Sequence, residues 1–309
     1  MGLILNSIEL FLIETQNNCI DIKNKNLLIL GYQQIYFNKS QLSELLSSYN
    51  KKINHVQKSE VELIELFKDL NFKNIDVLDI SSYEGANIIE DMNKKIQNKK
   101  LENYYDFILD WGTIEHVFNI PNYLSNINFM LNKNGYYYGV TPINGWLDHG
   151  FYQFSPTFFY DVFKKNWQII FQKILHFNST SIIADWDILK YNIGNLDIYA
   201  MGGIDSGMYQ NFFCIKKKNN LNLENINQTK FQLMWQKTKT HKKTKTHTQE
   251  SSKYNFKNLI AIFLNKFFSI FGYQIRISKL DYLKNNTIDT VLKEHIDYSV
   301  NSFKRIKFY

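Results

Sequence analysis

The amino-acid sequence predicts an α/β protein built on a doubly wound, mostly parallel sheet of seven strands. Between residues 27 and 215, short apolar runs alternate with segments of helical periodicity. Strands that alternate with helices favour a parallel sheet covered on both faces, because each connection must cross back over the sheet. A content of 44% hydrophobic and 21% charged residues agrees with a folded chain. The predicted strands span residues 27–30, 76–80, 86–90, 105–109, 135–140, 167–174 and 212–216.

Two of the predicted helices carry recognisable start signals. Ser59 and Glu62 have the spacing of a capping box, in which each side chain binds an amide of the first turn. The apolar face that follows has helical spacing and consists of Leu63, Leu66, Phe67 and Leu70. Ser155 followed by Pro156 predicts a second helix start, with the helix continuing to about residue 165.

Charge divides the chain near residue 216. Residues 1–215 contain 17 Lys against 23 Asp and Glu, a formal charge of −6. Residues 216–309 contain 19 Lys and Arg against 6 Asp and Glu, a formal charge of +13. We therefore expect a folded domain over residues 1–215, a basic low-complexity linker over 216–255 and a helical tail over 256–309. The linker includes the repeat KTKTHKKTKTH, which has nothing apolar to bury.

The predicted tail begins with an apolar, aromatic-rich helix at residues 256–271. A basic segment followed by such a helix is typical of peripheral contact with an anionic membrane, so residues 237–271 are a candidate membrane-surface segment. The alternative is that the helix packs on the core or forms a homo-oligomer interface. At about 1.5 Å per residue the helix is too short to span a bilayer core of about 30 Å.

Several protein classes are disfavoured by the sequence. Only two cysteines occur, Cys19 and Cys214, without zinc-site spacing, which argues against a disulfide scaffold. The N-terminal segment meets Glu9 and Glu14 too early for a signal peptide. No apolar run reaches the roughly 18–20 residues of a membrane span. We expect a cytoplasmic protein, with the inner face of the membrane as its candidate docking surface.

Polar residues and one glycine follow the ends of successive predicted strands, where doubly wound sheets bind ligands. Gly31 follows the first strand without the other glycines of a dinucleotide motif. Asp79 ends the second strand in a position to bind a ribose diol, and Asp91 follows the third with acceptors suited to an adenine amino group. The alternative is that these are turn residues, and that Asp110, after the fourth strand, caps the next helix through Thr113.

The segment YDFILDWGTIEHVFNIPNYLSNINFMLNKNGYYYGVTP at residues 105–142 resembles the class I S-adenosylmethionine-dependent methyltransferases. The resemblance covers about residues 25–215 and implies a Rossmann-like methyltransferase fold. The segment HGFYQFSPTFFYDVF at residues 149–163 is similar to a branch linked to surface-glycan gene clusters. In that branch the glycine motif is reduced to Leu-Gly-x-Gln, which residues 30–33 match.

The resemblance implies S-adenosylmethionine as cofactor. Gly31 would then pass close to the methionine part, Asp79 would hold the ribose, Asp91 the adenine edge, and Asp110 would lie near the sulfonium or amine. The implied reaction is methyl transfer to a hydroxyl of a sugar or of a glycan precursor in polysaccharide biosynthesis. The alternatives are a noncatalytic methyltransferase-like binding protein and a membrane-docked scaffold.

A hydroxyl acceptor benefits from a general base, for which histidine suits neutral pH. His149 is the preferred candidate and His116 the second, while Tyr152 and Gln153 are candidate acceptor contacts. A metal site built from Asp110, His116 and His149 is disfavoured, so no metal is expected. A nucleic-acid substrate is also disfavoured, because residues 110–113 lack the Asn/Asp-Pro-Pro-aromatic pattern of base methylation and residues 1–215 are acidic.

Overall fold

The structure is a computed structural model that describes residues 2–177, 185–194, 196, 207–229 and 296–300. The chain divides into two compact units, and the first comprises residues 1–193, 206–226 and 295–309. The fold described below is that of this first unit. The expected linker repeat and the apolar segment 256–271 lie outside the described residues, so the membrane-surface and oligomer expectations for them stay predictions.

The centre of the fold is a nine-stranded sheet with the order β11-β9-β8-β10-β7-β6-β2-β4-β5. Five adjacent strands, from β5 to β7, are parallel to one another, and the remaining pairs are antiparallel. The strands are β2 (Asn26–Leu30), β4 (Asn74–Asp79), β5 (Ile88–Ile89), β6 (Tyr105–Trp111), β7 (Leu131–Asn144), β8 (Trp167–Phe177), β9 (Trp186–Lys190), β10 (Met208–Lys217) and β11 (Ile296–Val300). A separate two-stranded sheet pairs β1 (Gly2–Leu3) with β3 (Gln34–Ile35).

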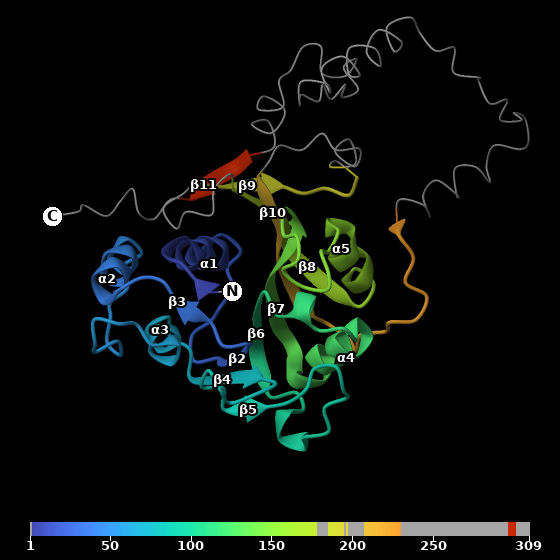
Figure 1. Cartoon of the computed structure of the whole chain (residues 1–309), viewed down its shortest axis with the longest axis horizontal. Helices are drawn as coiled ribbons and strands as arrows, with labels where there is room; N and C mark the ends of the chain where they lie inside the picture. The colour runs from blue at the N-terminus through green and yellow to red at the C-terminus, as the bar shows by residue number, and fades with distance from the viewer. Residues whose placement is uncertain (1, 178–184, 195, 197–206, 230–295, 301–309) are drawn as a thin grey trace, which may run out of the picture. The chain divides into compact units, whose positions relative to one another are not determined.

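Helices cover both faces of the sheet, as Figure 1 shows. On one side lie α1 (Leu5–Asn17), α2 (Lys39–Ser48) and α3 (Leu63–Asp69), and on the other lie α4 (Ile120–Met130) and α5 (Pro156–Phe163). Short 3-10 helices form at η1 (Lys99–Leu101) and η2 (Ile114–His116). The prediction of an α/β fold with a doubly wound sheet is confirmed at this level.

Successive strand side chains point to opposite faces of the sheet, so two separate hydrophobic cores form. In β2, Leu27 and Ile29 face the core under α1 to α3, whereas Leu28 and Leu30 face the core under α4 and α5. All four side chains are fully buried, as expected for a strand covered on both faces. Period-two alternation therefore fixes which side of the sheet each strand residue serves.

The sheet has two strands more than the seven expected. All seven expected segments form strands, and β9 and β11 extend the sheet beyond β8. Residues 296–300, which were expected to be helical, form β11, and Lys173 of β8 binds both Glu14 of α1 (2.7 Å) and Asp297 of β11 (2.8 Å). This half-buried lysine pairs with acids far away in sequence, a contact that local patterns cannot reveal.

The capping box expected at Ser59 and Glu62 is wrong. Helix α3 begins at Leu63, and its N-cap Glu62 makes no side-chain capping bond. Residues 59 and 60 instead pair with the start of α2, because the Ser59 carbonyl accepts from the Lys39 amide (2.9 Å) and Glu60 bridges to Asn38. The expected apolar face is confirmed, since its four members are buried.

The folded body continues past the expected boundary at residue 215. Strand β10 ends at Lys217, and the Asn219 carbonyl accepts from the Trp167 indole (2.9 Å). Leu221, Leu223 and Ile226 pack against the core under α4 and α5. Within the part of the chain that the structure describes, no helix is long and apolar enough to cross a membrane.

Candidate active site

The strand order creates a switch point between β2 and β6. From β2 the chain proceeds outward through β4 to β5, and from β6 it proceeds in the opposite direction to β7. Parallel registers align Leu30 with Leu78 and with Asp110. The residues that follow these strands therefore share one edge, which is where ligands bind in open α/β sheets.

Gly31 and Asp79 meet at this edge. The Gly31 amide donates to the Leu78 carbonyl (2.8 Å), and the Tyr32 amide donates to Asp79 Oδ2 (3.3 Å). Asp79 Oδ1 accepts from the Ile80 amide (2.6 Å). Each carboxylate oxygen retains a second lone-pair site. The half-buried Asp79 can therefore still accept from a ligand diol.

The glycine at position 31 is required by a protein contact. Gly31 has φ +69°, and a Cβ added there would lie 2.7 Å from Thr113 Oγ1. The Thr113 hydroxyl donates to the Leu30 carbonyl (2.7 Å), which holds it in this position. The tight-turn alternative thus accounts for Gly31 without a ligand. Beside it, Gln33 is 2% exposed, and its Nε2 donates to the Gly31 carbonyl (3.3 Å). Its Oε1 has no hydrogen-bond partner within the part of the chain that the structure describes.

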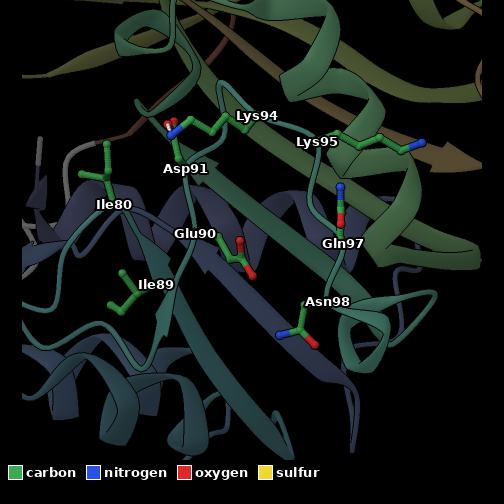
Figure 2. Close-up of a pocket in the computed structure, with 8 residues that line it drawn as sticks. All are labelled: Ile80, Ile89, Glu90, Asp91, Lys94, Lys95, Gln97 and Asn98. Atoms are coloured by element: carbon green, nitrogen blue, oxygen red, sulfur yellow. Dashed lines mark ion pairs between the residues drawn. The ribbon is translucent and has the colours of Figure 1, made fainter.

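Asp91 borders a cavity of about 450 Å³ next to β5, shown in Figure 2. Ligand pockets commonly measure about 300–1,000 Å³. Ile80 and Ile89 line the cavity and are 67% and 49% exposed, so two apolar side chains face solvent here without a protein partner large enough to cover them. The Asn93 amide and Lys94 (3.1 Å) bind the Asp91 carboxylate and lower its pKa. The remaining lining residues are Glu90, Lys94, Lys95, Gln97 and Asn98.

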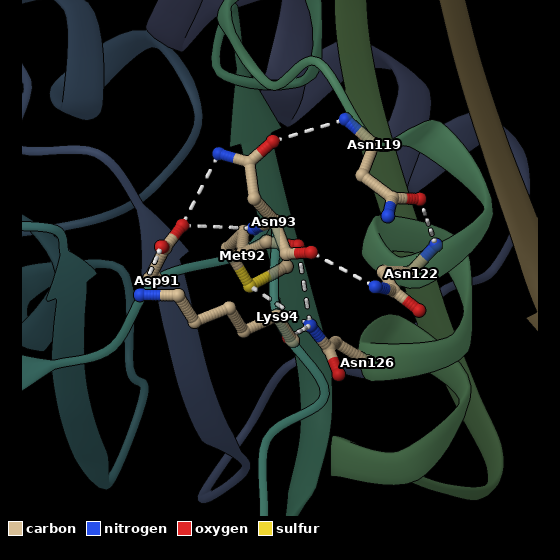
Figure 3. Close-up of polar contacts among 7 residues, drawn as sticks. All are labelled: Asp91, Met92, Asn93, Lys94, Asn119, Asn122 and Asn126. Atoms are coloured by element: carbon tan, nitrogen blue, oxygen red, sulfur yellow. Dashed lines mark hydrogen bonds and ion pairs between the residues drawn. The ribbon is translucent and has the colours of Figure 1, made fainter.

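An asparagine network fixes the loop that carries Asp91, as Figure 3 shows. Asn93 Oδ1 accepts from the Asn119 amide (3.0 Å), and Asn122 Nδ2 donates to the Asn93 carbonyl (2.8 Å). Asn126 donates to the Lys94 carbonyl (2.8 Å) and accepts from the Ile96 amide (3.0 Å). This network was not predicted from the sequence. The sequence feature that could have indicated it is the spacing of three and four residues between the N-cap asparagine and the next two asparagines of α4, which places them on one helix face.

Asp110 does not reach this edge. We expected the fourth strand to end at Leu109, but β6 continues to Trp111, so the Asp110 side chain points into the core under α4. It is fully buried and accepts from the Tyr123 hydroxyl (2.6 Å), the Tyr137 hydroxyl (2.8 Å) and the Thr113 amide (2.8 Å). Burial raises its pKa. The Thr113 contact is the one expected from the capping alternative, and the two tyrosine contacts hold the carboxylate in the core.

The two candidate histidines lie against each other, although 33 positions separate them in sequence. His116 ends η2, His149 lies in the loop after β7, and their ring centroids are 5.0 Å apart. The Trp146 ring lies on the other side of His149, at a centroid distance of 5.1 Å. Burial lowers the pKa of both histidines, and His149 adds to the effect on His116. Both are therefore neutral at pH 7.

Glu115 joins the histidines and was missed as a site residue by the sequence analysis. Its side chain is fully buried, and among the described residues neither carboxylate oxygen has a hydrogen-bond partner. Burial, with a contribution from Asp110, raises the pKa of Glu115 to about 8. Its position inside the Glu-His-Val trio of residues 115–117 was the available signal.

The two side chains predicted to contact the acceptor, Tyr152 and Gln153, lie in different surroundings. The Tyr152 hydroxyl donates to the Phe118 carbonyl (2.9 Å), whereas Gln153 is exposed. Phe118 and Phe151 are each 69% exposed and meet edge to face at 5.9 Å. Each lies two residues after one of the histidines, so an exposed aromatic pair adjoins the histidine pair.

Comparisons with known proteins yield fold likenesses only. No family model matches the chain, and no curated protein matches it. A solved structure of MccD protein is 14% identical, with a TM-score of 0.39, covering 67% of this chain and 96% of its own. A putative S-adenosylmethionine-dependent methyltransferase from Listeria monocytogenes is 10% identical, with a TM-score of 0.37 and the same coverages.

A third solved structure is the N-methyltransferase NodS from Bradyrhizobium japonicum in complex with S-adenosylhomocysteine. It is 8% identical, with a TM-score of 0.37, covering 69% of this chain and 88% of its own. The solved structures similar to this chain thus include S-adenosylmethionine-dependent methyltransferases. Because the TM-scores are below 0.5, we assign neither a family nor an activity from these likenesses.

Proposed function

We propose that this protein transfers a methyl group from S-adenosylmethionine to a hydroxyl of a sugar or surface-glycan precursor. The observation that carries the proposal is that Asp79 and the buried Gln33 lie where β4 and β2 end, while a cavity bordered by Asp91 lies beside β5, two strands along from β2. The resemblance at residues 105–142 supports the same cofactor.

The residues at this edge fit the parts of the proposed cofactor. The free lone pairs of Asp79 suit the ribose hydroxyls. Exposed Ile80 and Ile89 offer apolar surface to an adenine ring, and the Asp91 carboxylate accepts from its amino group. Gln33 Oε1, buried without a partner beside Gly31, suits the methionine ammonium group. An unsatisfied buried acceptor costs roughly 1–3 kcal/mol, which a ligand donor would recover.

The acceptor would bind on the histidine side of the edge. When bound, S-adenosylmethionine supplies an electrophilic methyl carbon, and the C–S bonding electrons stay on sulfur as the acceptor oxygen bonds to carbon. We assign His149 as the group that takes the hydroxyl proton, because histidine suits general-base catalysis at neutral pH and the His116 ring lies beside it. The exposed rings of Phe118 and Phe151 offer apolar faces to a sugar ring, and Gln153 offers it a free amide.

Calorimetry of the full chain with S-adenosylmethionine and S-adenosylhomocysteine tests the cofactor. We expect micromolar binding that Asp79→Ala abolishes. The matched control is Asp76→Ala on the same strand, whose carboxylate binds Tyr105 (2.9 Å) and Asn87 (2.6 Å) and should leave binding intact. No heat from either ligand at about 1 mM would refute the proposal and favour the noncatalytic alternative.

The acceptor side is tested by S-adenosylhomocysteine release with a panel of sugar nucleotides. We expect His149→Ala to keep cofactor affinity while slowing turnover by about 100-fold or more, the typical contribution of acid–base catalysis. Unchanged turnover would show that His149 takes no part in the transfer. Turnover only with acceptors that lack a hydroxyl would refute the proposed substrate class.

A further inference from the structure

Three side chains with metal-binding groups converge on the histidine side of the edge. They are Glu115 and His116 of η2 and His149 of the loop after β7. One potential ligand atom from each lies within 4.8 Å of the other two. The metal site considered from the sequence combined Asp110 with the two histidines. In the structure, Glu115 and not Asp110 lies with these histidines.

The cluster contains buried polar atoms that no group in the described ranges satisfies. Glu115 has 0% exposure and two unpartnered oxygens, and His149 Nε2 is buried and unpartnered as well. Leaving such groups buried and unsatisfied costs free energy. A cation bound between them would satisfy one Glu115 oxygen and His149 Nε2. His116 is exposed, so an ion could enter from solvent.

Backbone contacts hold the two segments together. The Glu115 carbonyl accepts from the Tyr152 amide (3.2 Å), which joins η2 to the loop after β7, and within that loop the His149 amide donates to the Trp146 carbonyl (3.4 Å). A Cβ added at Gly150 would lie 3.0 Å from the Glu115 carbonyl oxygen, so a glycine permits this close approach. The cluster is therefore positioned by the fold before any ion arrives.

We propose that Glu115, His116 and His149 bind a divalent transition-metal cation of the Zn²⁺ type. Two imidazoles and one carboxylate are the ligands of many catalytic zinc sites, which keep a fourth position open for water or substrate. Imidazole ligands disfavour Mg²⁺ and Ca²⁺. Tetrahedral bonds of about 2.0–2.1 Å place ligands roughly 3.3 Å apart, so small side-chain rotations would close the observed separations.

The site has a role if the proposed function holds, although the binding itself does not depend on it. An acceptor hydroxyl at the open position would lose its proton to water more readily, because the cation lowers its pKa. In that case His149 would act as a metal ligand and not as the general base, because neutral imidazole has a single lone pair.

Calorimetry of the full chain, first stripped with a chelator and without S-adenosylmethionine, tests the site with ZnCl₂ and CoCl₂. We expect one ion per chain with micromolar or tighter affinity, and a Co²⁺ absorption spectrum typical of imidazole and carboxylate ligands. His116→Ala removes an exposed side chain and should weaken binding by more than the roughly 10–100-fold that loss of an outer partner costs. Glu115→Gln and His149→Ala should do the same.

Two controls separate this site from other histidines. His55→Ala, at an exposed position outside the cluster, and the double variant His241→Ala/His247→Ala in the basic repeat should leave the stoichiometry unchanged. Absence of binding at about 100 μM metal, or binding that survives all three cluster substitutions, would overturn the proposal. Metal binding without cofactor binding would refute the proposed function alone, and cofactor binding without metal binding would refute the metal site alone.

Discussion

The contribution of the buried Asp110 carboxylate to the free energy of unfolding can be measured by substitution. Asp110→Ala would leave the Tyr123 hydroxyl, the Tyr137 hydroxyl and the Thr113 amide without their acceptor. Each orphaned buried donor costs about 1–3 kcal/mol, so the free energy of unfolding should fall by at least about 3 kcal/mol. Urea unfolding at pH 7, followed by the fluorescence of the five tryptophans, measures this loss.

A matched control lies on the same strand. Asp106 is half-buried and accepts from the Asn26 amide (3.0 Å) and from Asn132 (3.1 Å), so Asp106→Ala should cost only about 1 kcal/mol. Equal losses for the two variants, or a loss below about 1 kcal/mol for Asp110→Ala, would refute the reasoning. Asp110→Asn should also keep the affinity for S-adenosylmethionine. Loss of that affinity would indicate that Asp110 contributes to cofactor binding.

Three further changes test the packing around the site. Gly31→Ala should destabilise the fold by about 1–3 kcal/mol, because φ +69° is strained for alanine and Thr113 Oγ1 lies 2.7 Å from the new Cβ. Adding Thr113→Ala should recover part of that loss, and full additivity in urea unfolding would contradict the contact. Lys217→Met should cost about 2 kcal/mol by the same assay, because the buried ammonium group donates to the Asn128 carbonyl (2.5 Å) and the Leu131 carbonyl (2.6 Å). Burial raises the pKa of Tyr137 well above 10, so the unfolded chain releases this proton first and stability falls as pH rises through about 10. Tyr137→Phe should make that fall less steep between pH 9 and 11, and an identical slope would contradict the shift.

Local sequence patterns predicted the helices whose buried face or first turn depends on residues close together in sequence. The helical spacing from Leu63 to Leu70 placed α3, because an apolar stripe must face the sheet whatever lies beneath it. Ser155 and Pro156 placed the start of α5, although the Ser155 side chain makes no capping bond. Proline at the first helical position lacks an amide that would need a partner, so it favours a helix start without help from tertiary contacts.

Predicted element boundaries were wrong where the backbone pairs with a segment distant in sequence. Ser59 had the sequence of a cap, but its carbonyl pairs with the Lys39 amide, 20 positions away. Asp110 was expected just after a strand ending at Leu109, yet pairing with β7 carries β6 two residues further, to Trp111. Because Asp110 lies inside the strand, its side chain follows the strand alternation into the core.

The sequence by itself determined which residues alternate across the sheet and which residues stand where the parallel strands end, because these follow from short-range periodicity. Gly31, Asp79 and Asp91 were placed on that basis. Only the tertiary structure decided that His116 and His149 touch, that Glu115 is buried beside them without a partner, and that Thr113 fills the space above Gly31. Those contacts join segments that are distant in sequence, the ends of β2 and β6 in one case and η2 and the loop after β7 in the other, so no local pattern records them.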